Sequence, residues 1–210
     1  MTRILIADDH EVVRAGVRGI LEDHPGWHIV AEALDGKQAV DKSIAEKPDV
    51  AILDYSLPMI NGVEATRQIR ARAPSVEILI FTMHDNEILM RDMLQAGARG
   101  YLLKSDAGEH LISAVQALAA HRPFFTSKAS EALLESYLTT ARQSEHLLTA
   151  RERGIVQLVA EGHSNKQIAN LLGISIKTVE THRATIMRKL NLTSSAALVR
   201  YAVRHKIVEP

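Results

Sequence analysis

The sequence contains no cysteine, so disulfide bridges, thiolate metal sites and cysteine catalysis are excluded. It also lacks the glycine-rich motifs that cradle nucleotide phosphates, both G-x-x-x-x-G-K-S/T and G-x-G-x-x-G. No apolar run approaches the ~18 residues of a membrane span. The first apolar run ends on two aspartates and is too short for the core of a signal peptide. These absences predict a cytoplasmic protein without a membrane partner.

Charge is unevenly distributed along the chain. Its 210 residues include 25 Lys and Arg and 25 Asp and Glu, which gives a net charge of zero. Residues 1–125 nevertheless carry a net charge of −5, and residues 126–210 carry +5. An acidic first part and a basic second part favour two domains with different partners. A basic domain of this size is typical of nucleic-acid binders.

The first part alternates between short apolar runs and segments with helical spacing of apolar residues. The runs predict strands at 3–7, 27–33, 50–53, 76–81 and 99–103, and the spacing predicts helices at 11–22, 37–46, 63–72, 87–96 and 107–120. Strands joined by helical crossovers form a parallel sheet that is covered on both faces. Residues 1–120 are therefore predicted to be a doubly wound α/β domain with five strands in the flavodoxin-like order 2-1-3-4-5.

The second part has no strand pattern. Residues 121–126 read as a junction and 127–143 as a helix, so 121–145 are predicted to be a linker with helical content. Residues 146–210 are predicted to form a small all-α domain of four helices. Capping residues and glycines bound these helices: Thr149 with Glu152 and then Gly162, Ser164 or Asn165 and then Gly173, Ser175 before 176–190, and Thr193 or Ser194 before 196–204.

Polar side chains follow four of the predicted strands. They are Asp8 and Asp9 after the first strand, Asp54 after the third, Thr82 after the fourth and Lys104 after the fifth. The carboxyl ends of parallel strands meet at one edge, where ligands bind. Close carboxylates repel one another unless a cation joins them, and oxygen ligands suit Mg²⁺. An ammonium group and a hydroxyl beside that cation would neutralise a phosphoryl group, which predicts Asp54 as a nucleophile that forms an aspartyl-phosphate.

The predicted helix at 176–190 follows a short helix and a tight turn, which is a helix-turn-helix pattern. Ile176, Val179, Ile186 and Leu190 are predicted to face inward. The polar side chains are predicted to face outward and to enter the major groove of double-stranded DNA; they include Lys177, Thr178, Glu180, Thr181, His182 and Arg183.

The first part resembles the receiver domain of bacterial two-component response regulators. The resemblance rests on the segments Ile4–His10 and Asp54–Gly62 together with Thr82 and Lys104. It implies that a histidine kinase phosphorylates Asp54, and that Asp8 or Asp9, Asp54 and the backbone carbonyl of Ser56 hold Mg²⁺. It also implies that Lys104 contacts the phosphoryl group and that Thr82 and Tyr101 form a switch pair. The sequence departs from the family at Ser105, where proline after a cis bond is usual, so the isomer of this bond is left open.

The second part is similar to the DNA-binding domain of the LuxR/NarL/FixJ type. The similarity rests on Leu148–Arg153, Glu161–Ala169, Thr178–His182 and Arg188–Leu190. It implies a module whose third helix enters the major groove and whose last helix supports dimer contacts. By position, Lys166 is expected to contact a phosphate. The whole chain is thus expected to be a phosphorylation-controlled transcription regulator that forms a homodimer when phosphorylated and binds promoter DNA, with RNA polymerase as a further candidate partner.

Two other functions remain as alternatives. A Mg²⁺-dependent phosphohydrolase also uses an aspartate nucleophile on such a sheet, but it needs a second carboxylate, commonly two residues later, as acid or base. That position is Ser56, so we expect a protein that is not an enzyme. The other alternative is a regulator that works without phosphorylation. The complete set of polar residues at the strand ends argues against it.

Overall fold

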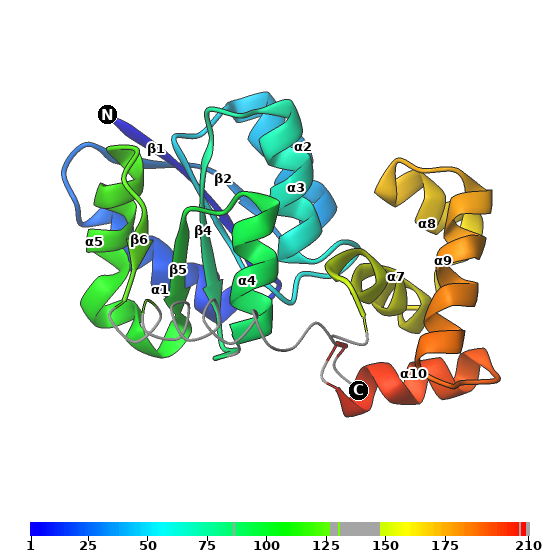
Figure 1. Ribbon diagram of the computed structural model, residues 1–210. Coiled ribbons are helices and arrows are strands. Elements are labelled where there is room, and N and C mark those ends of the chain that lie inside the picture. The colour runs from blue at the N-terminus through cyan, green and yellow to red at the C-terminus, as the bar shows by residue number, and fades with distance from the viewer. Residues whose placement is uncertain (86, 127–129, 131–147, 206, 209–210) are drawn as a thin grey trace. The chain divides into compact units, whose positions relative to one another are not determined.

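A computed structural model describes residues 1–85, 87–126, 130, 148–205 and 207–208 (Figure 1). The chain divides into two compact units, residues 1–143 and 144–210. The helix predicted at 127–143 lies outside the described residues, apart from Ser130. Within the described part of the chain, no helix has the length and apolar character that crossing a membrane requires.

The first unit is built on a parallel sheet in the order β2-β1-β3-β4-β5-β6. Its strands are β1 (Thr2–Ala7), β2 (Trp27–Ala33), β3 (Val50–Leu53), β4 (Glu77–Thr82), β5 (Gly100–Leu103) and β6 (Phe124–Phe125). The first five strands stand in the predicted flavodoxin-like order. Every residue of β3 and β4 is buried, as expected for central strands covered on both faces. The sequence prediction of a doubly wound α/β fold is confirmed.

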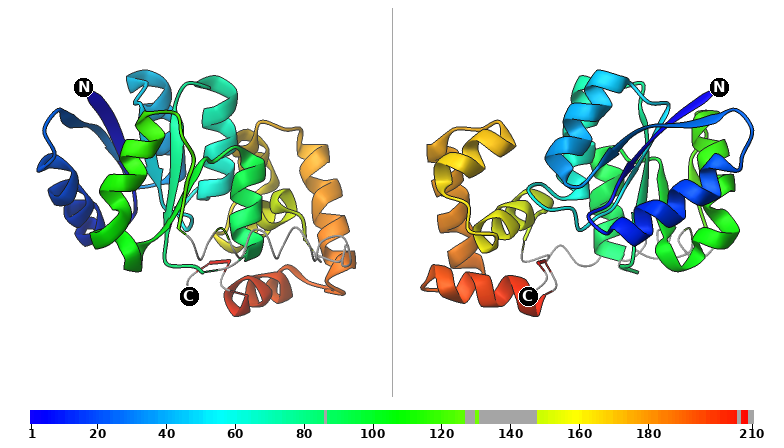
Figure 2. Two further views of the ribbon diagram at one scale, coloured as in Figure 1. Left: turned by 60° about the vertical axis from the view of Figure 1, so that its left-hand side comes forward. Right: turned by 180° about the vertical axis from the view of Figure 1, so that it is seen from behind.

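Five helices cover the two faces of this sheet: α1 (Glu11–Glu22), α2 (Gly36–Glu46), α3 (Gly62–Arg72), α4 (Glu87–Ala96) and α5 (Ala107–Ala119). Helices α1 and α5 pack together on one face, and α2, α3 and α4 form a row on the other (Figure 2). Apolar side chains fill both layers. Polar groups that must act together are therefore confined to the strand ends.

The sixth strand was not predicted, since the sequence pattern indicates an irregular junction at 121–126. After α5 the chain reverses through His121, whose φ is 55°. Phe124 then lies beside β5, where its backbone N–H donates to the carbonyl of Arg99 at 3.0 Å. Its side chain packs against the apolar core. A strand of two residues has no alternation that a sequence pattern could reveal.

The loop after β3 folds back tightly on the end of that strand. The N–H of Gly62 donates to the carbonyl of Tyr55 at 2.9 Å. A Cβ atom added at Gly62 would lie 2.4 Å from the carbonyl oxygen of Asp54, so a larger residue cannot fit without moving the backbone. Glycine at this position lets the loop close against Asp54.

The second unit contains the four predicted helices: α7 (Ala150–Ala160), α8 (Asn165–Leu172), α9 (Ile176–Lys189) and α10 (Ser195–Arg204). The capping box of Thr149 and Glu152 is present as predicted. Gly173, with φ of 64°, ends α8 and starts the tight turn to α9. Side-chain caps from Ser175 and Ser194 open α9 and α10. The helix-turn-helix prediction is confirmed in its geometry.

One residue of α9 was assigned to the wrong face. Val179 and Ile186 are buried as predicted, but Ile176 is 45% exposed. It is the first residue of the helix. A side chain there has no preceding helical turn beneath it, so the apolar period alone does not determine which way it faces.

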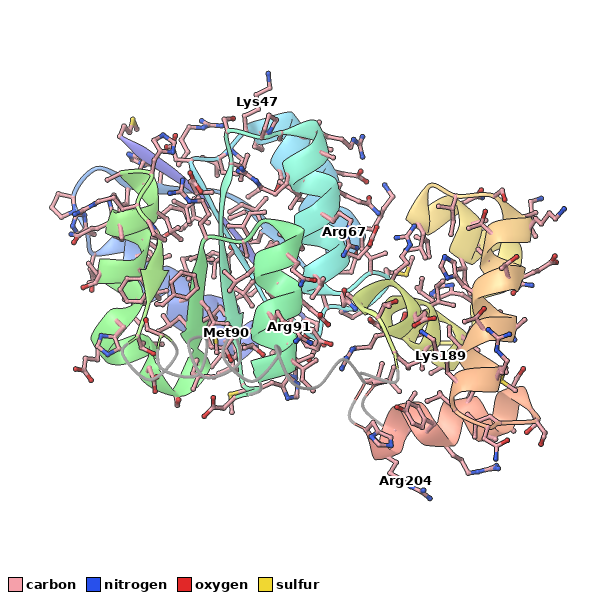
Figure 3. The ribbon with its side chains drawn as sticks, in the orientation of Figure 1. Lys47, Arg67, Met90, Arg91, Lys189 and Arg204 are labelled. Carbon is pink, nitrogen blue, oxygen red and sulfur yellow. The ribbon has the colours of Figure 1, made fainter. Side chains whose placement is uncertain are left out.

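An ion pair between a buried carboxylate and an exposed ammonium group joins the start of α7 to the end of α9. Glu152 is 4% exposed, and Lys189 (labelled in Figure 3) donates to its Oε2 at 2.7 Å. The backbone N–H of Thr149 donates to the same oxygen at 2.8 Å. Burial would raise the pKa of Glu152, but the hydrogen bonds from Lys189 and Thr149 and the charge of Lys189 outweigh it, and the pKa is lowered.

We expect Glu152→Gln to lower the unfolding free energy of the second unit by about 1–3 kcal/mol near neutral pH, because Lys189 loses a charged partner. The lowered pKa means that the stabilisation is present above the ordinary value of 4.5 and is lost as the pH falls through the folded-state pKa. Wild type and variant should therefore converge at acid pH.

Thermal unfolding followed by far-UV circular dichroism measures this difference. Trp27, the only tryptophan, lies in the first unit, so its fluorescence follows that unit separately and serves as the control. Equal stability at neutral pH, or a difference that persists at acid pH, would contradict the assigned role of the ion pair.

Candidate functional site

Three side chains from three strand ends meet at the carboxyl edge of the sheet. Asp8 follows β1, Asp54 follows β3 and Lys104 follows β5. The two carboxylates are only 2% and 4% exposed. The Nζ atom of Lys104 lies 2.6 Å from Oδ2 of Asp8 and 3.0 Å from Oδ2 of Asp54. The structure thus brings together the predicted acceptor, one predicted metal ligand and the predicted phosphoryl contact.

The charges at this edge are only partly balanced. Burial raises the pKa of Asp54, and the nearby carboxylate of Asp8 raises it further; the charge and hydrogen bond of Lys104 and a backbone hydrogen bond at Ser56 lower it, but the net shift is upward. Burial disfavours the charged form of Lys104, yet the two carboxylates outweigh this and raise its pKa. The ammonium group of Lys104 is therefore held in its charged form. At Asp54, the positive charge of Lys104 does not fully offset the effects of burial and of the Asp8 carboxylate.

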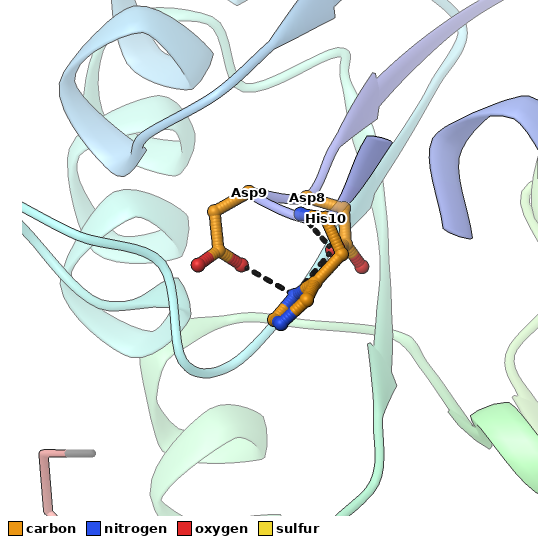
Figure 4. Close-up of side chains that lie close together, drawn as sticks. All are labelled: Asp8, Asp9 and His10. Carbon is orange, nitrogen blue, oxygen red and sulfur yellow. Dashed lines mark hydrogen bonds and ion pairs between the residues drawn. The ribbon is translucent and has the colours of Figure 1, made fainter. Parts of the chain in front are cut away.

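Asp9 and His10 follow Asp8 in the chain, and the side chains of these three residues lie close together (Figure 4). The Nδ1 atom of His10 is 2.9 Å from Oδ1 of Asp9 and 3.3 Å from Oδ1 of Asp8. Ligand atoms of Asp8, Asp9 and His10 all lie within 4.8 Å of one another. Carboxylate oxygens predominate in this donor set, and their excess negative charge fits a hard divalent cation such as Mg²⁺.

Thr82 and Tyr101 are both buried and both contact the same residue, His84. The hydroxyl of Thr82 accepts a hydrogen bond from the backbone N–H of His84 at 3.1 Å. The phenol of Tyr101 donates to the backbone carbonyl of His84. The imidazole of His84 also lies 3.1 Å from the hydroxyl of Ser56. His84 was not among the predicted site residues, because its role depends on backbone groups that its residue type does not reveal.

The chain turns directly from β5 into a short 3₁₀ helix, Lys104–Asp106. The bond between Lys104 and Ser105 is trans, and the hydroxyl of Ser105 donates to Oδ1 of Asp106 at 2.7 Å. The isomer that the sequence left open is thereby established, and Lys104 still reaches both carboxylates.

The predicted DNA contacts lie on the surface of the second unit but differ in their partners. Lys166, Lys177, Thr178, Glu180 and Thr181 are exposed, whereas His182 and Arg183 are partly buried. The guanidinium of Arg183 donates to Oδ1 of Asn165 at 2.6 Å and to the hydroxyl of Ser195 at 3.1 Å. It therefore ties α9 to the first residues of α8 and α10.

Comparison with known proteins identifies the family. Residues 4–116 match the family described as response regulator receiver domain, and residues 146–202 match the family described as bacterial regulatory proteins, luxR family. The chain belongs to the response regulators. This response regulator is 40% identical to the oxygen regulatory protein NreC of Staphylococcus epidermidis and 39% identical to NreC of Staphylococcus carnosus, over 99% of both chains in each case.

Solved structures of response regulators have the same architecture. RcsB of Salmonella enterica serovar Typhimurium, bound to the promoter rprA in the presence of the phosphomimetic BeF₃⁻, has a TM-score of 0.68 at 28% identity. That comparison covers 95% of this chain and 97% of RcsB. A LuxR-family two-component response regulator from Aurantimonas has a TM-score of 0.63 at 36% identity, covering 66% of this chain and 99% of that one.

The partly balanced charge leads to a prediction on stability. We expect Asp54→Asn to raise the melting temperature of the metal-free first unit, because a raised pKa means that folding opposes the charge of this carboxylate at neutral pH. Excess Mg²⁺ should raise the melting temperature of the wild type, since it binds the folded state, and should raise that of the variant less.

Trp27 fluorescence during heating, with a chelator and with Mg²⁺, measures both effects. Asp41→Asn is the matched control, because Asp41 is an exposed carboxylate on α2 that pairs with Lys37 at the surface. A lower melting temperature for Asp54→Asn without metal, or an equal response of both proteins to Mg²⁺, would contradict the prediction.

Proposed function

We propose that a histidine kinase phosphorylates this response regulator on Asp54 and that phosphorylation controls the binding of its second unit to promoter DNA, and so controls transcription. The observation that carries the proposal is the position of Asp54, buried at the end of β3 with the ammonium of Lys104 3.0 Å away. A fixed cation beside this carboxylate can hold an oxygen of an incoming phosphoryl group.

The chemistry that we propose is a displacement at phosphorus. An oxygen of Asp54 forms a bond to phosphorus while the bond between phosphorus and the nitrogen of the kinase histidine breaks, and the imidazole leaves. Lys104 holds one oxygen of the phosphoryl group by charge. Asp8, Asp9, Asp54 and the backbone carbonyl of Ser56 are the proposed ligands of Mg²⁺, which when bound would neutralise the carboxylates and the incoming phosphoryl oxygens.

Thr82 and Tyr101 are the proposed switch. The hydroxyl of Thr82 accepts from the N–H of His84, so its own hydrogen is available for a phosphoryl oxygen. Drawing Thr82 toward that oxygen shifts His84, whose carbonyl is the acceptor for Tyr101. The two switch residues are thus linked through one residue of the loop after β4.

The second unit is the proposed DNA-binding module. Helix α9 enters the major groove, with Lys177, Thr178, Glu180, Thr181, His182 and Arg183 as candidate contacts and Lys166 of α8 on a phosphate. The net charge of +5 over residues 126–210 supports binding to a polyanion. We assign residues 1–120 to the receiver domain, 121–145 to the linker and 146–210 to this module.

The proposed partners follow from this organisation. One helix-turn-helix module contacts too little DNA for tight specific binding, which favours a homodimer of the phosphorylated protein on paired half-sites. The histidine kinase, promoter DNA and, as a further candidate, RNA polymerase would meet the protein in the cytoplasm. A phosphohydrolase is disfavoured because Ser56 provides no carboxylate two residues after Asp54.

We expect a small acyl-phosphate donor to add one phosphoryl group to the wild type, and only when a divalent cation is present. Asp54→Ala should remove the mass increase completely, because the variant lacks the carboxylate oxygen that forms the bond to phosphorus. Intact-protein mass spectrometry measures the product, and Asp41→Ala is the control that should be phosphorylated normally. Phosphorylation of Asp54→Ala at the wild-type rate would place the acceptor elsewhere.

Phosphorylation should also raise the affinity of the full-length protein for its promoter, together with a shift from monomer to dimer. Thr82→Ala should still be phosphorylated but should show a smaller gain in affinity, because the link to His84 and Tyr101 is lost. Fluorescence anisotropy with labelled DNA and analytical ultracentrifugation measure these effects. An unchanged gain in the phosphorylated variant would remove Thr82 from the switch.

A further inference from the structure

The outward face of α9 carries an uncompensated carboxylate. Glu180 is exposed and lies in the first half of the helix, which in helix-turn-helix proteins is the half that contacts bases. The cations three residues away on either side are Lys177 and Arg183. Among the described residues, neither these nor any other cation lies within 4.0 Å of the carboxylate of Glu180.

The partners of Arg183 explain why this carboxylate is bare. Its guanidinium is held by Oδ1 of Asn165 at 2.6 Å and by the hydroxyl of Ser195 at 3.1 Å, away from Glu180. Thr181, the next exposed residue, donates its hydroxyl to the carbonyl of Lys177 at 3.0 Å. Glu180 therefore offers a free acceptor on this part of the surface, whereas the hydroxyl beside it is already engaged.

DNA phosphates repel an unpaired carboxylate whatever the base sequence. A hydrogen-bond donor on a base edge, placed where the carboxylate lies in the groove, can offset this repulsion. In the major groove, the exocyclic amino groups of cytosine and adenine are the donors on base edges. On adenine an acceptor, N7, accompanies the amino group, so a carboxylate is repelled there. Cytosine presents its N4 amino group without an acceptor on the same base edge, so it is the base that a carboxylate accepts from most readily.

We propose that Glu180 is a specificity-determining residue of this regulator, which accepts a hydrogen bond from the N4 amino group of a cytosine in each half-site. The inference rests on the proposed DNA-binding function. Arg183 braces α9 against α8 and α10 through its bonds to Asn165 and Ser195, so it does not neutralise Glu180. A merely solvated surface glutamate would instead affect all DNA sequences alike.

Selection from a randomised duplex library with the phosphorylated full-length protein tests the proposal. The wild type should enrich cytosine at one position of each half-site. Glu180→Ala should lose the preference at that position and keep it at the others. Glu180→Gln should change the preference there from cytosine to adenine, because an amide can donate to N7 and accept from N6 of adenine.

Affinity measurements on the selected site give the magnitude. Replacing the cytosine should weaken binding of the wild type about 5- to 100-fold, as a lost base contact does, and should leave Glu180→Ala nearly unaffected. Glu161→Gln is the matched control: it removes the same charge from the end of α7 and keeps an acceptor for Gln157. It should raise affinity slightly for all sequences and leave the base preference unchanged.

The outcomes separate the two levels of inference. If the wild type enriches a defined sequence and Glu180→Ala and Glu180→Gln enrich the same bases at every position, the proposed role of Glu180 is wrong while DNA binding stands. The same conclusion follows if Glu180 variants behave like Glu161→Gln. If the wild type enriches no sequence, the proposed function itself fails.

Discussion

The structure depends on one electrostatic arrangement, the ammonium of Lys104 held between the buried carboxylates of Asp8 and Asp54. Such a cluster is tolerated only at the edge of an otherwise apolar sheet, because an isolated charge inside the sheet would lose its hydration without compensation. The strands place the three groups there, since in a parallel sheet every carboxyl end points to the same edge. The pKa of Lys104 is raised, so this group is charged. The pKa of Asp54 is also raised, and a bound metal ion would supply positive charge that favours its ionised form.

Much of this could be predicted from the sequence for a simple reason. In β1, β3 and β5 the apolar run ends where the strand ends, and in β4 it ends one residue earlier, so the first polar residue marks both the boundary and the candidate site. Prediction failed where that coincidence is absent. The two-residue strand β6 has no periodicity, Ile176 is the first residue of its helix and is exposed, and His84 bonds Thr82 and Tyr101 through its backbone groups. The partners of Arg183 are 12 and 18 residues away in sequence and belong to other helices, so only the folded unit reveals them.

The two residues of the proposed switch are connected through a third residue. Thr82 and Tyr101 are paired with each other across neighbouring strands only indirectly, through opposite ends of the same residue, the N–H and the carbonyl of His84. Because both backbone groups of His84 are hydrogen-bonded, a movement of either Thr82 or Tyr101 would move this residue. Tyr101 also pairs with Phe125 of β6. The strand that sequence patterns do not detect thus joins the strand of Tyr101 to the part of the chain that follows the sheet.

In the second unit, charged side chains that have partners within the unit differ from those that have none. The buried Glu152 and the exposed Lys189 form an ion pair that connects α7 to α9. Arg183 is satisfied by Asn165 and Ser195 and fixes the position of α9 against its neighbours. These groups have hydrogen-bond partners within the unit, so they contribute to its stability. Glu180 is exposed and has no cation beside it among the described residues, so water completes its hydrogen bonds in the free protein and its carboxylate is available to the base that we propose.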